Sequence, residues 1–165
     1  MIIHASKTFA EHLKCTVSGP NRRLPHHASL DSWSIDLFKL AKGGAFALVM
    51  NDASLSTIII PLKGVRNFEV FLPLVLARVA AFLAKHGAAF DTCNQSVIIL
   101  PRSNRSLIGT MNEAKFLIQD SVEHKLTLAG DIDWDALESR LNETPYSRIG
   151  YATPDKRLRE LLAEQ

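Results

Sequence analysis

The sequence has little of what marks secreted, membrane-spanning and nucleic-acid-binding chains. It contains only two cysteines, Cys15 and Cys93, which form no C-x-x-C pair, so a reduced chain is favoured over one with a disulfide. The net charge is only +2, whereas nucleic-acid-binding domains usually carry a concentrated basic face. The most apolar stretch, residues 68–84, includes Glu69 and Arg78 and therefore predicts a core helix rather than a membrane span.

The N-terminal segment lacks the uninterrupted apolar run of a signal peptide, because His4 and Lys7 fall within its first residues. The sequence therefore predicts a cytoplasmic protein that contacts no membrane. Its 165 residues, of which 47% are hydrophobic and 22% charged, suit a single domain, residues 1–165, with its own core. Residues 131–165 are predicted to form a helical C-terminal segment that packs on this domain.

Short motifs that would name a reaction or a cofactor are absent as well. There is no glycine-rich phosphate-binding pattern and no G-x-S-x-G nucleophile elbow. The stretch DIDWDALESRLN has the spacing of a calcium loop, but Ala136 and Asn142 stand where the loop needs glycine and glutamate, so Asp133 is better explained as a helix cap. His26 and His27 have no third ligand at a recognisable spacing. No metal and no cofactor are predicted, and an enzymatic role is left open but not favoured.

The hydrophobic pattern predicts an α+β fold. Alternating or β-branched runs predict strands over residues 1–4, 32–40, 43–50, 54–62 and 96–100, with the run at 54–62 in a central position. Helices are predicted over residues 6–14, 67–87, about 103–124, 134–142 and 154–163, with Ser6, Asn67, Asp133 and Thr153 as N-caps. The expected architecture is a mainly antiparallel sheet of about five strands, packed by a buried central helix at 67–87 and by further helices.

The stretch RSNRSLIGTMNE, residues 102–113, marks the transition from the last strand to a helix. With Ser103 taken as the cap, a helix N-terminus with two arginines is suited to contact an anion, because its free N–H groups and its dipole favour negative charge. The candidate ligand-binding residues in this stretch are Arg102, Ser103, Asn104, Arg105, Ser106 and Asn112. The alternative is an ordinary helix start in which Arg105 pairs with an internal acid.

The same helix has two distinct faces. A turn of 100° per residue places Leu107, Ile108, Met111, Ala114 and Ile118 on one broad core face. A narrow stripe lies opposite and contains Arg105, Gly109, Asn112 and Phe116. Glycine costs about 1 kcal/mol relative to alanine inside a helix, and a large aromatic is unusual on an exposed face. The stripe, with Gly109 and Phe116 as the candidate interaction face, is therefore expected to be covered, either by the chain's own C-terminal segment or by a ligand or partner.

The order of these features resembles an uncharacterised bacterial family, a domain of unknown function related to proteins of plasmid open reading frames. The blocks that carry the resemblance are Ser6-Lys7-Thr8, Trp33, Asn51-Asp52, NRSLIGTMN at 104–112 and LNETP at 141–145. The family often has Trp-His where this chain has Trp33-Ser34, and its basic pair is here reduced to Lys7. The resemblance implies a bacterial intracellular setting and little more. Lys7 and Trp33 are further candidate ligand-binding residues.

Three functional hypotheses follow. The first is a non-catalytic binding or interaction module, an accessory of a mobile element, whose partner is another protein or a second copy of the chain. The second, not favoured, is a nucleic-acid-binding protein in which Lys7, Arg102 and Arg105 contact phosphates. The third is an enzyme that acts on a phosphorylated or carboxylated small molecule held by the two arginines, and it requires Lys7, Trp33 and the Arg105 stripe to converge on one pocket.

Overall fold

The computed structural model describes residues 1–18, 30–40, 44–92, 96–126 and 132–164. The predictions made for His26, His27 and Cys93 lie outside these residues, and Cys15 carries a free thiol.

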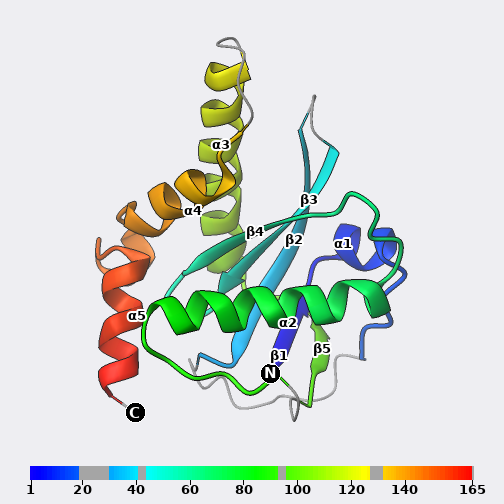
Figure 1. Cartoon of the computed structure of the whole chain (residues 1–165), viewed down its shortest axis with the longest axis horizontal. Helices are drawn as coiled ribbons and strands as arrows, with labels where there is room; N and C mark the ends of the chain where they lie inside the picture. The colour runs from blue at the N-terminus through cyan, green and yellow to red at the C-terminus, as the bar shows by residue number, and fades with distance from the viewer. Residues whose placement is uncertain (19–29, 41–43, 93–95, 127–131, 165) are drawn as a thin grey trace.

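Five strands form one mixed sheet in the order β4-β3-β2-β1-β5 (Figure 1). Their bounds are Ile2–Ala5 for β1, Ser32–Leu40 for β2, Gly44–Asn51 for β3, Thr57–Pro61 for β4 and Ile98–Pro101 for β5. The strands β2, β3 and β4 are successive antiparallel neighbours, whereas β1 lies parallel to both β2 and β5. The predicted α+β class with a mainly antiparallel sheet is confirmed.

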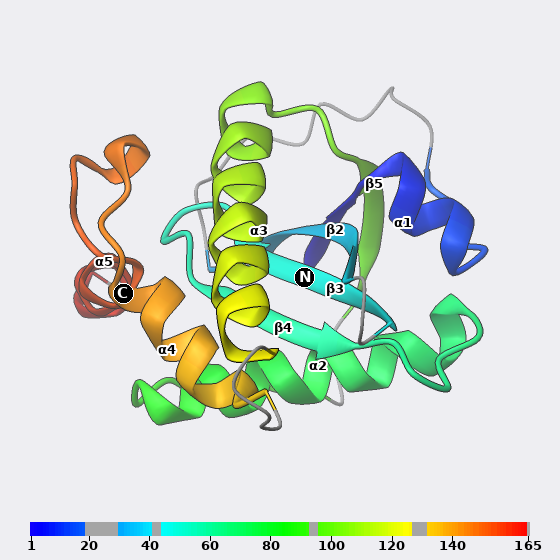
Figure 2. The ribbon, with the colours of Figure 1, turned by 90° about the horizontal axis from the view of Figure 1, so that it is seen from above.

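Helices cover both faces of this sheet. They are α1 (Lys7–His12), α2 (Phe68–Lys85), α3 (Arg105–Leu126), α4 (Trp134–Glu143) and α5 (Pro154–Ala163), with a 3-10 turn, η1, at Ser147–Ile149. Figure 2 shows α2 on one side of the strands and α3 on the other. Among the described residues, no helix combines the length and the apolarity needed to cross a membrane.

The predicted N-caps are confirmed for four helices. The side-chain oxygens of Ser6, Asn67, Asp133 and Thr153 each accept a hydrogen bond from the backbone N–H three residues further on, at 2.9–3.2 Å. Each bond satisfies one of the N–H groups that a helix start leaves without an intrahelical partner. Local capping chemistry therefore defines where these helices begin.

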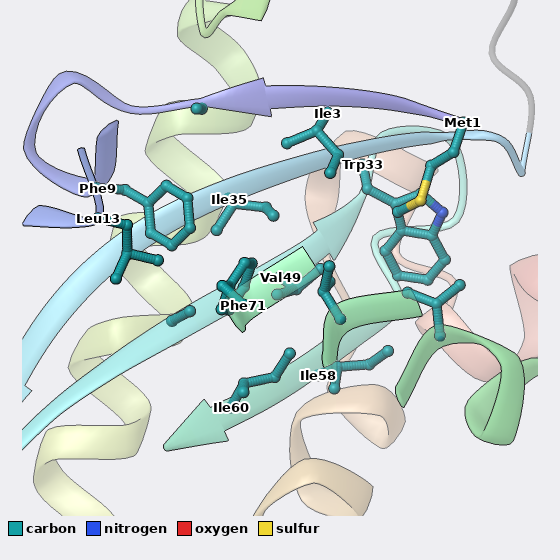
Figure 3. Close-up of a cluster of buried hydrophobic side chains, with 14 of the residues drawn as sticks. Met1, Ile3, Phe9, Leu13, Trp33, Ile35, Val49, Ile58, Ile60 and Phe71 are labelled. Atoms are coloured by element: carbon teal, nitrogen blue, oxygen red, sulfur yellow. The ribbon is translucent and has the colours of Figure 1, made fainter. Parts of the chain in front are cut away.

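The larger hydrophobic core lies between the sheet and α1 and α2 (Figure 3). Trp33 and Ile35 of β2 lie in it, together with Phe9 of α1 and Phe71 of α2, and all four are fully buried. The rings of Phe9 and Phe71 meet edge to face with their centroids 5.0 Å apart. Pairs of this geometry contribute about 0.5–1.5 kcal/mol beyond the area they bury. The two helices are thereby joined to each other as well as to the sheet.

The helix at 67–87, which was expected to be a buried central helix, is less buried than the sequence predicts. Only one stripe of α2 is fully covered, formed by Phe71, Val75, Val79 and Leu83. Val70 and Leu74 are exposed apolar residues on its outer side. The misleading signal was the abundance of Ala and Leu around the whole helix, which are common helix formers wherever the helix lies.

The placement of the strand at 54–62 in the middle of the sheet is also wrong, because β4 is an edge strand of the described sheet. Its edge is covered by polar side chains of α4. The N–H of Thr57 donates to Oδ1 of Asn142 at 2.7 Å, and Nδ2 of Asn142 donates to the carbonyl oxygen of Thr57 at 2.9 Å. The N–H of Ile59 donates to Oε1 of Glu138 at 2.8 Å. Exposed strand edges recruit other chains, and α4 removes that liability by satisfying the edge groups.

Arg78 of α2 completes this edge contact, since its Nη2 donates to Oε1 of Glu138 at 2.5 Å. Burial raises the pKa of Glu138, although the Ile59 N–H and the charge of Arg78 act in the opposite direction. One carboxylate thus connects α2, α4 and β4.

Replacing Asn142 with alanine should lower the free energy of unfolding by about 2–3 kcal/mol, because the substitution leaves the buried N–H and C=O of Thr57 without their partners. Urea unfolding of the wild type and the variant measures the difference. The control is Glu143→Ala, which removes an exposed side chain next to Asn142 on the same helix. Equal stability of the two variants would contradict the role given to Asn142.

Candidate functional site

The helix that follows the strand-to-helix turn begins one residue later than the sequence predicts. Asn104 is the residue that caps α3: its Oδ1 accepts a hydrogen bond from the N–H of Leu107 at 3.2 Å, and its carbonyl oxygen accepts from the N–H of Ile108 at 3.0 Å. The assignment of Ser103 as the cap is therefore wrong. Arg148, from η1, also approaches this cap, with its Nη1 3.4 Å from Oδ1 of Asn104. The cap thus ties the start of α3 to the C-terminal segment.

Arg102 points into the protein rather than toward a ligand. Its Nη1 donates to Oδ2 of Asp36, on β2, at 2.9 Å, and the side chains of Arg102 and Asp36 are only 10% and 5% exposed. Lys115, from the third turn of α3, forms an ion pair with the same carboxylate oxygen. The expected pairing of an arginine with an internal acid therefore exists, but it involves Arg102 and not Arg105. We call Asp36, Arg102 and Lys115 the ion cluster.

The ion cluster holds Asp36 in its charged form. Burial alone would raise the pKa of this carboxyl, but hydrogen bonds from Lys115 and Ser6 and the charges of Lys115 and Arg102 outweigh it, so the pKa of Asp36 lies below its ordinary value. Its other oxygen, Oδ1, accepts from the N–H of Leu37 at 2.9 Å. A carboxylate satisfied on both oxygens is a structural clamp between β2 and α3.

A second polar group lies beside the ion cluster on the same face of the sheet. Oδ2 and Oδ1 of Asp52 accept hydrogen bonds from the hydroxyls of Ser32 and Ser34 at 2.6 and 2.7 Å. Nε2 of His4, on β1, lies 3.5 Å from Oδ2 of Asp52. Both serines therefore donate to the carboxylate of Asp52 rather than to His4.

Sequence reasoning missed both polar groups. The alternation along residues 32–40 placed Ser34 and Asp36 on the less buried face of a half-buried strand, but both residues are buried, since β2 carries helices on both sides. His4 belongs to no motif that can be recognised in the sequence. Its position opposite Ser34 follows only from the parallel pairing of β1 with β2. The one signal in the sequence was the concentration of polar residues at alternate positions of a strand.

The two faces of α3 are as the helical period predicted. Leu107, Met111, Ala114 and Ile118 are fully buried against the sheet, and Ile108 is partly buried. The opposite stripe, formed by Arg105, Gly109, Asn112 and Phe116, is exposed, and Phe116 is 69% exposed. We call this stripe the outer face of α3. A Cβ added to Gly109 would meet no atom within 4 Å, leaving aside its chain neighbours and the backbone of its own helix.

The expectation that the C-terminal segment covers this outer face is wrong. That segment instead packs at the edge of β4 through α4, and against the larger hydrophobic core through Leu158 of α5. The Nε2 atom of His86, at the end of α2, lies 3.2 Å from Oδ1 of Asp155 at the start of α5. Figure 2 shows α4 and α5 beside α3 and not over its outer side.

The remaining candidate residues do not meet on a common site. Lys7 is exposed on α1, and its Nζ lies 3.8 Å from Oε1 of Glu11. Trp33 is fully buried in the core on the α2 side, and its Nε1 donates to the carbonyl oxygen of Leu30 at 2.8 Å. Arg105 lies on the outer face of α3, beyond the opposite side of the sheet. Convergence, which the enzyme hypothesis required, is not found.

Residues 2–157 match the family model described as a domain of unknown function (DUF6933). The chain belongs to this family. The match extends from β1 into α5, so it includes the ion cluster, the whole of α3 and the α4 contact with β4. A comparison with curated proteins finds no match.

Replacing Asp36 with asparagine should lower the free energy of unfolding at neutral pH by about 3 kcal/mol, because it leaves two cations close together without their counter-charge. The pKa of Asp36 is lowered by folding, so its contribution is complete above pH about 4 and is lost as the pH falls through the folded pKa. The difference in stability between wild type and variant should therefore shrink in acid. Urea unfolding between pH 7 and pH 3 measures it, with the exposed Asp31→Asn as control. A difference that does not change with pH would contradict the assignment.

Proposed function

We propose that this protein is a non-catalytic interaction module that binds a protein partner through the outer face of α3. The observation that carries the proposal is Phe116, a large aromatic that is 69% exposed on a helix whose opposite face is fully buried. Aromatic residues are enriched among the few side chains that dominate binding energy at interfaces. The ion cluster and the buried residues of α3 hold this aromatic on a rigid support, which reduces the entropy that binding must overcome.

A single exposed apolar residue is ordinary on a protein surface, so Phe116 alone would not support this proposal. Gly109 adds weight to it. This residue lies two turns away on the same face, has no positive φ that would demand glycine, and leaves open space where a side chain would fit. The fold therefore does not require glycine there, although glycine weakens a helix. Close approach of a partner to the helix backbone explains the glycine at position 109, which the fold itself does not require.

The other two hypotheses have less support. The nucleic-acid hypothesis requires Lys7, Arg102 and Arg105 to contact phosphates. Arg102 is instead buried against Asp36, and Lys7 lies on another helix, where it pairs with Glu11. In the part of the chain that the structure describes, Lys7, Trp33 and Arg105 lie apart, contrary to what the enzyme hypothesis requires, and the buried hydroxyl of Tyr146 is a poor general base. Burial, with the nearby charge of Glu113, raises the pKa of Tyr146 to about 12, so this hydroxyl stays protonated at physiological pH.

The setting of the proposed interaction is the bacterial cytoplasm. This setting rests on the resemblance to proteins of plasmid open reading frames. The function that corresponds to the resemblance is an accessory role for a mobile element. An interaction module needs no cofactor, and nothing in the proposal depends on one.

Gly109→Ala should raise the free energy of unfolding by about 0.5–1 kcal/mol, because alanine is the better helix former and its Cβ meets open space. Urea unfolding in dilute solution measures the change. The matched control is Gly87→Ala, which should be destabilising because Gly87 has a left-handed φ of 80°. If Gly109→Ala destabilises the protein, the fold itself needs this glycine and the argument from it fails.

A photo-crosslinking amino acid in place of Phe116, in the full chain produced in bacterial cells, should form one dominant covalent adduct with the partner. The same amino acid at Tyr151, an aromatic that is 75% exposed outside α3, is the control and should not form it. Adding Gly109→Gln should remove the adduct, since the new side chain occupies the open space without strain within the chain. Mass spectrometry identifies the captured protein. The proposal is wrong if position 116 gives no adduct, or the same adducts as position 151.

A further inference from the structure

The outer face of α3 has a spacing that reads the same in both directions along the helix. Arg105, Gly109, Phe116 and Asp120 follow one another at intervals of four, seven and four residues. Residues four or seven apart lie on the same face of an α-helix, so all four share one stripe. A stripe with this symmetry is complementary to itself when a second helix lies against it in the opposite direction. This is the condition for an isologous interface, in which residue i meets j and j meets i.

We propose that the partner at this face is a second copy of the chain, which pairs α3 with α3 in antiparallel orientation about a twofold axis between Asn112 and Glu113. The proposal rests on the function proposed above and names its partner. In this register Phe116 of each copy meets Gly109 of the other, because both pairs are centred on the same point of the helix. The aromatic ring fills the space that the missing side chain leaves open.

The charges of the stripe match the same register. Arg105 stands near the N-terminus of the helix, whereas Asp120 and the exposed Glu123 stand in its second half. Antiparallel pairing brings Arg105 of each copy opposite Asp120 of the other, with Glu123 one turn away. Asp120 already has an interaction within its own chain, and Glu123 supplies a second acid within reach of the arginine. A parallel arrangement would instead set like charges side by side, which costs binding energy and excludes that orientation.

The support for the pairing is already rigid. Lys115 lies on the flank of α3 and is tied to Asp36, and the cap at Asn104 fixes the start of the helix. Figure 2 shows α3 as an outer layer of the molecule, so a second copy can approach it without displacing another element. Interfaces that need little rearrangement keep more of their contact energy as affinity.

Sedimentation velocity of the purified full chain over a wide concentration range tests this directly. The wild type should show a monomer–dimer equilibrium. Phe116→Ala should raise the dimer dissociation constant about 30-fold or more, as expected for a central aromatic anchor. Tyr151→Ala removes an equally exposed aromatic outside α3 and should leave the constant unchanged. Circular dichroism and thermal unfolding confirm that each variant is folded.

Charge reversal distinguishes the antiparallel register from any other association. Arg105→Glu alone, and Asp120→Arg combined with Glu123→Arg, should each weaken the homodimer about tenfold or more, because like charges then meet at both ends. An equimolar mixture of these two variants should form a heterodimer with an affinity within about threefold of the wild type, since both ends regain opposite charges. Lys7→Glu, an exposed reversal on α1, is the control.

A wild type that remains monomeric at all concentrations would overturn the proposal, as would a dimer that is insensitive to Phe116→Ala or a mixture that fails to recover. Failure here is distinguishable from failure of the proposed function. If the chain is monomeric while the crosslinker at position 116 captures a different protein, the interaction module stands and the second copy is ruled out. If position 116 captures nothing, both proposals fail.

Discussion

The arrangement of this protein depends on one buried carboxylate. Asp36 lies near the middle of β2 and forms ion pairs with two cations, Arg102 before α3 and Lys115 within it. Removing Asp36 would leave two cations without their counter-charge in a largely buried place, which is far more costly than losing an exposed ion pair. The long helix is therefore held in one rotational position on the sheet. Because that rotation is fixed, the residues on its far side are fixed as well.

Most elements could be predicted from the sequence because local chemistry determines them. The caps at Ser6 and Asn67 and the alternation along β2 are signals within a few residues of one another. The edge position of β4 could not be predicted in this way. A run of β-branched residues indicates burial, and β4 is buried, but the backbone groups on its outer edge find their partners in Glu138 and Asn142, which follow it by about 80 residues in the sequence. On a short amphipathic helix those two residues looked like ordinary surface residues.

The same reasoning explains why the outer face of α3 was located correctly while its expected cover was wrong. The helical period depends only on the spacing of Leu107, Met111 and Phe116, so the two faces follow from the sequence. The destination of the C-terminal segment depends on competition between surfaces. The edge of β4 offers backbone N–H and C=O groups that must find partners, and an unsatisfied buried group of this kind costs about 1–3 kcal/mol. Packing against an exposed aromatic on an otherwise polar stripe gains less free energy. The helix α4 therefore packs at the edge of β4 and not on the outer face of α3.

The ion cluster also determines which positive charge is available outside. Arg102, in the turn before α3, pairs with Asp36 and stabilises the fold. Arg105, about one helical turn further along, lies on the exposed side of the helix. The motif resembles a single anion-binding turn, but the rotational position of the helix places one of its arginines inside the protein and the other on the surface. The interior half fixes how α3 lies, and the exterior half presents a cation, an open glycine and an aromatic in a fixed line. Complementarity along that line requires the helix not to rotate, and the buried carboxylate is what prevents it.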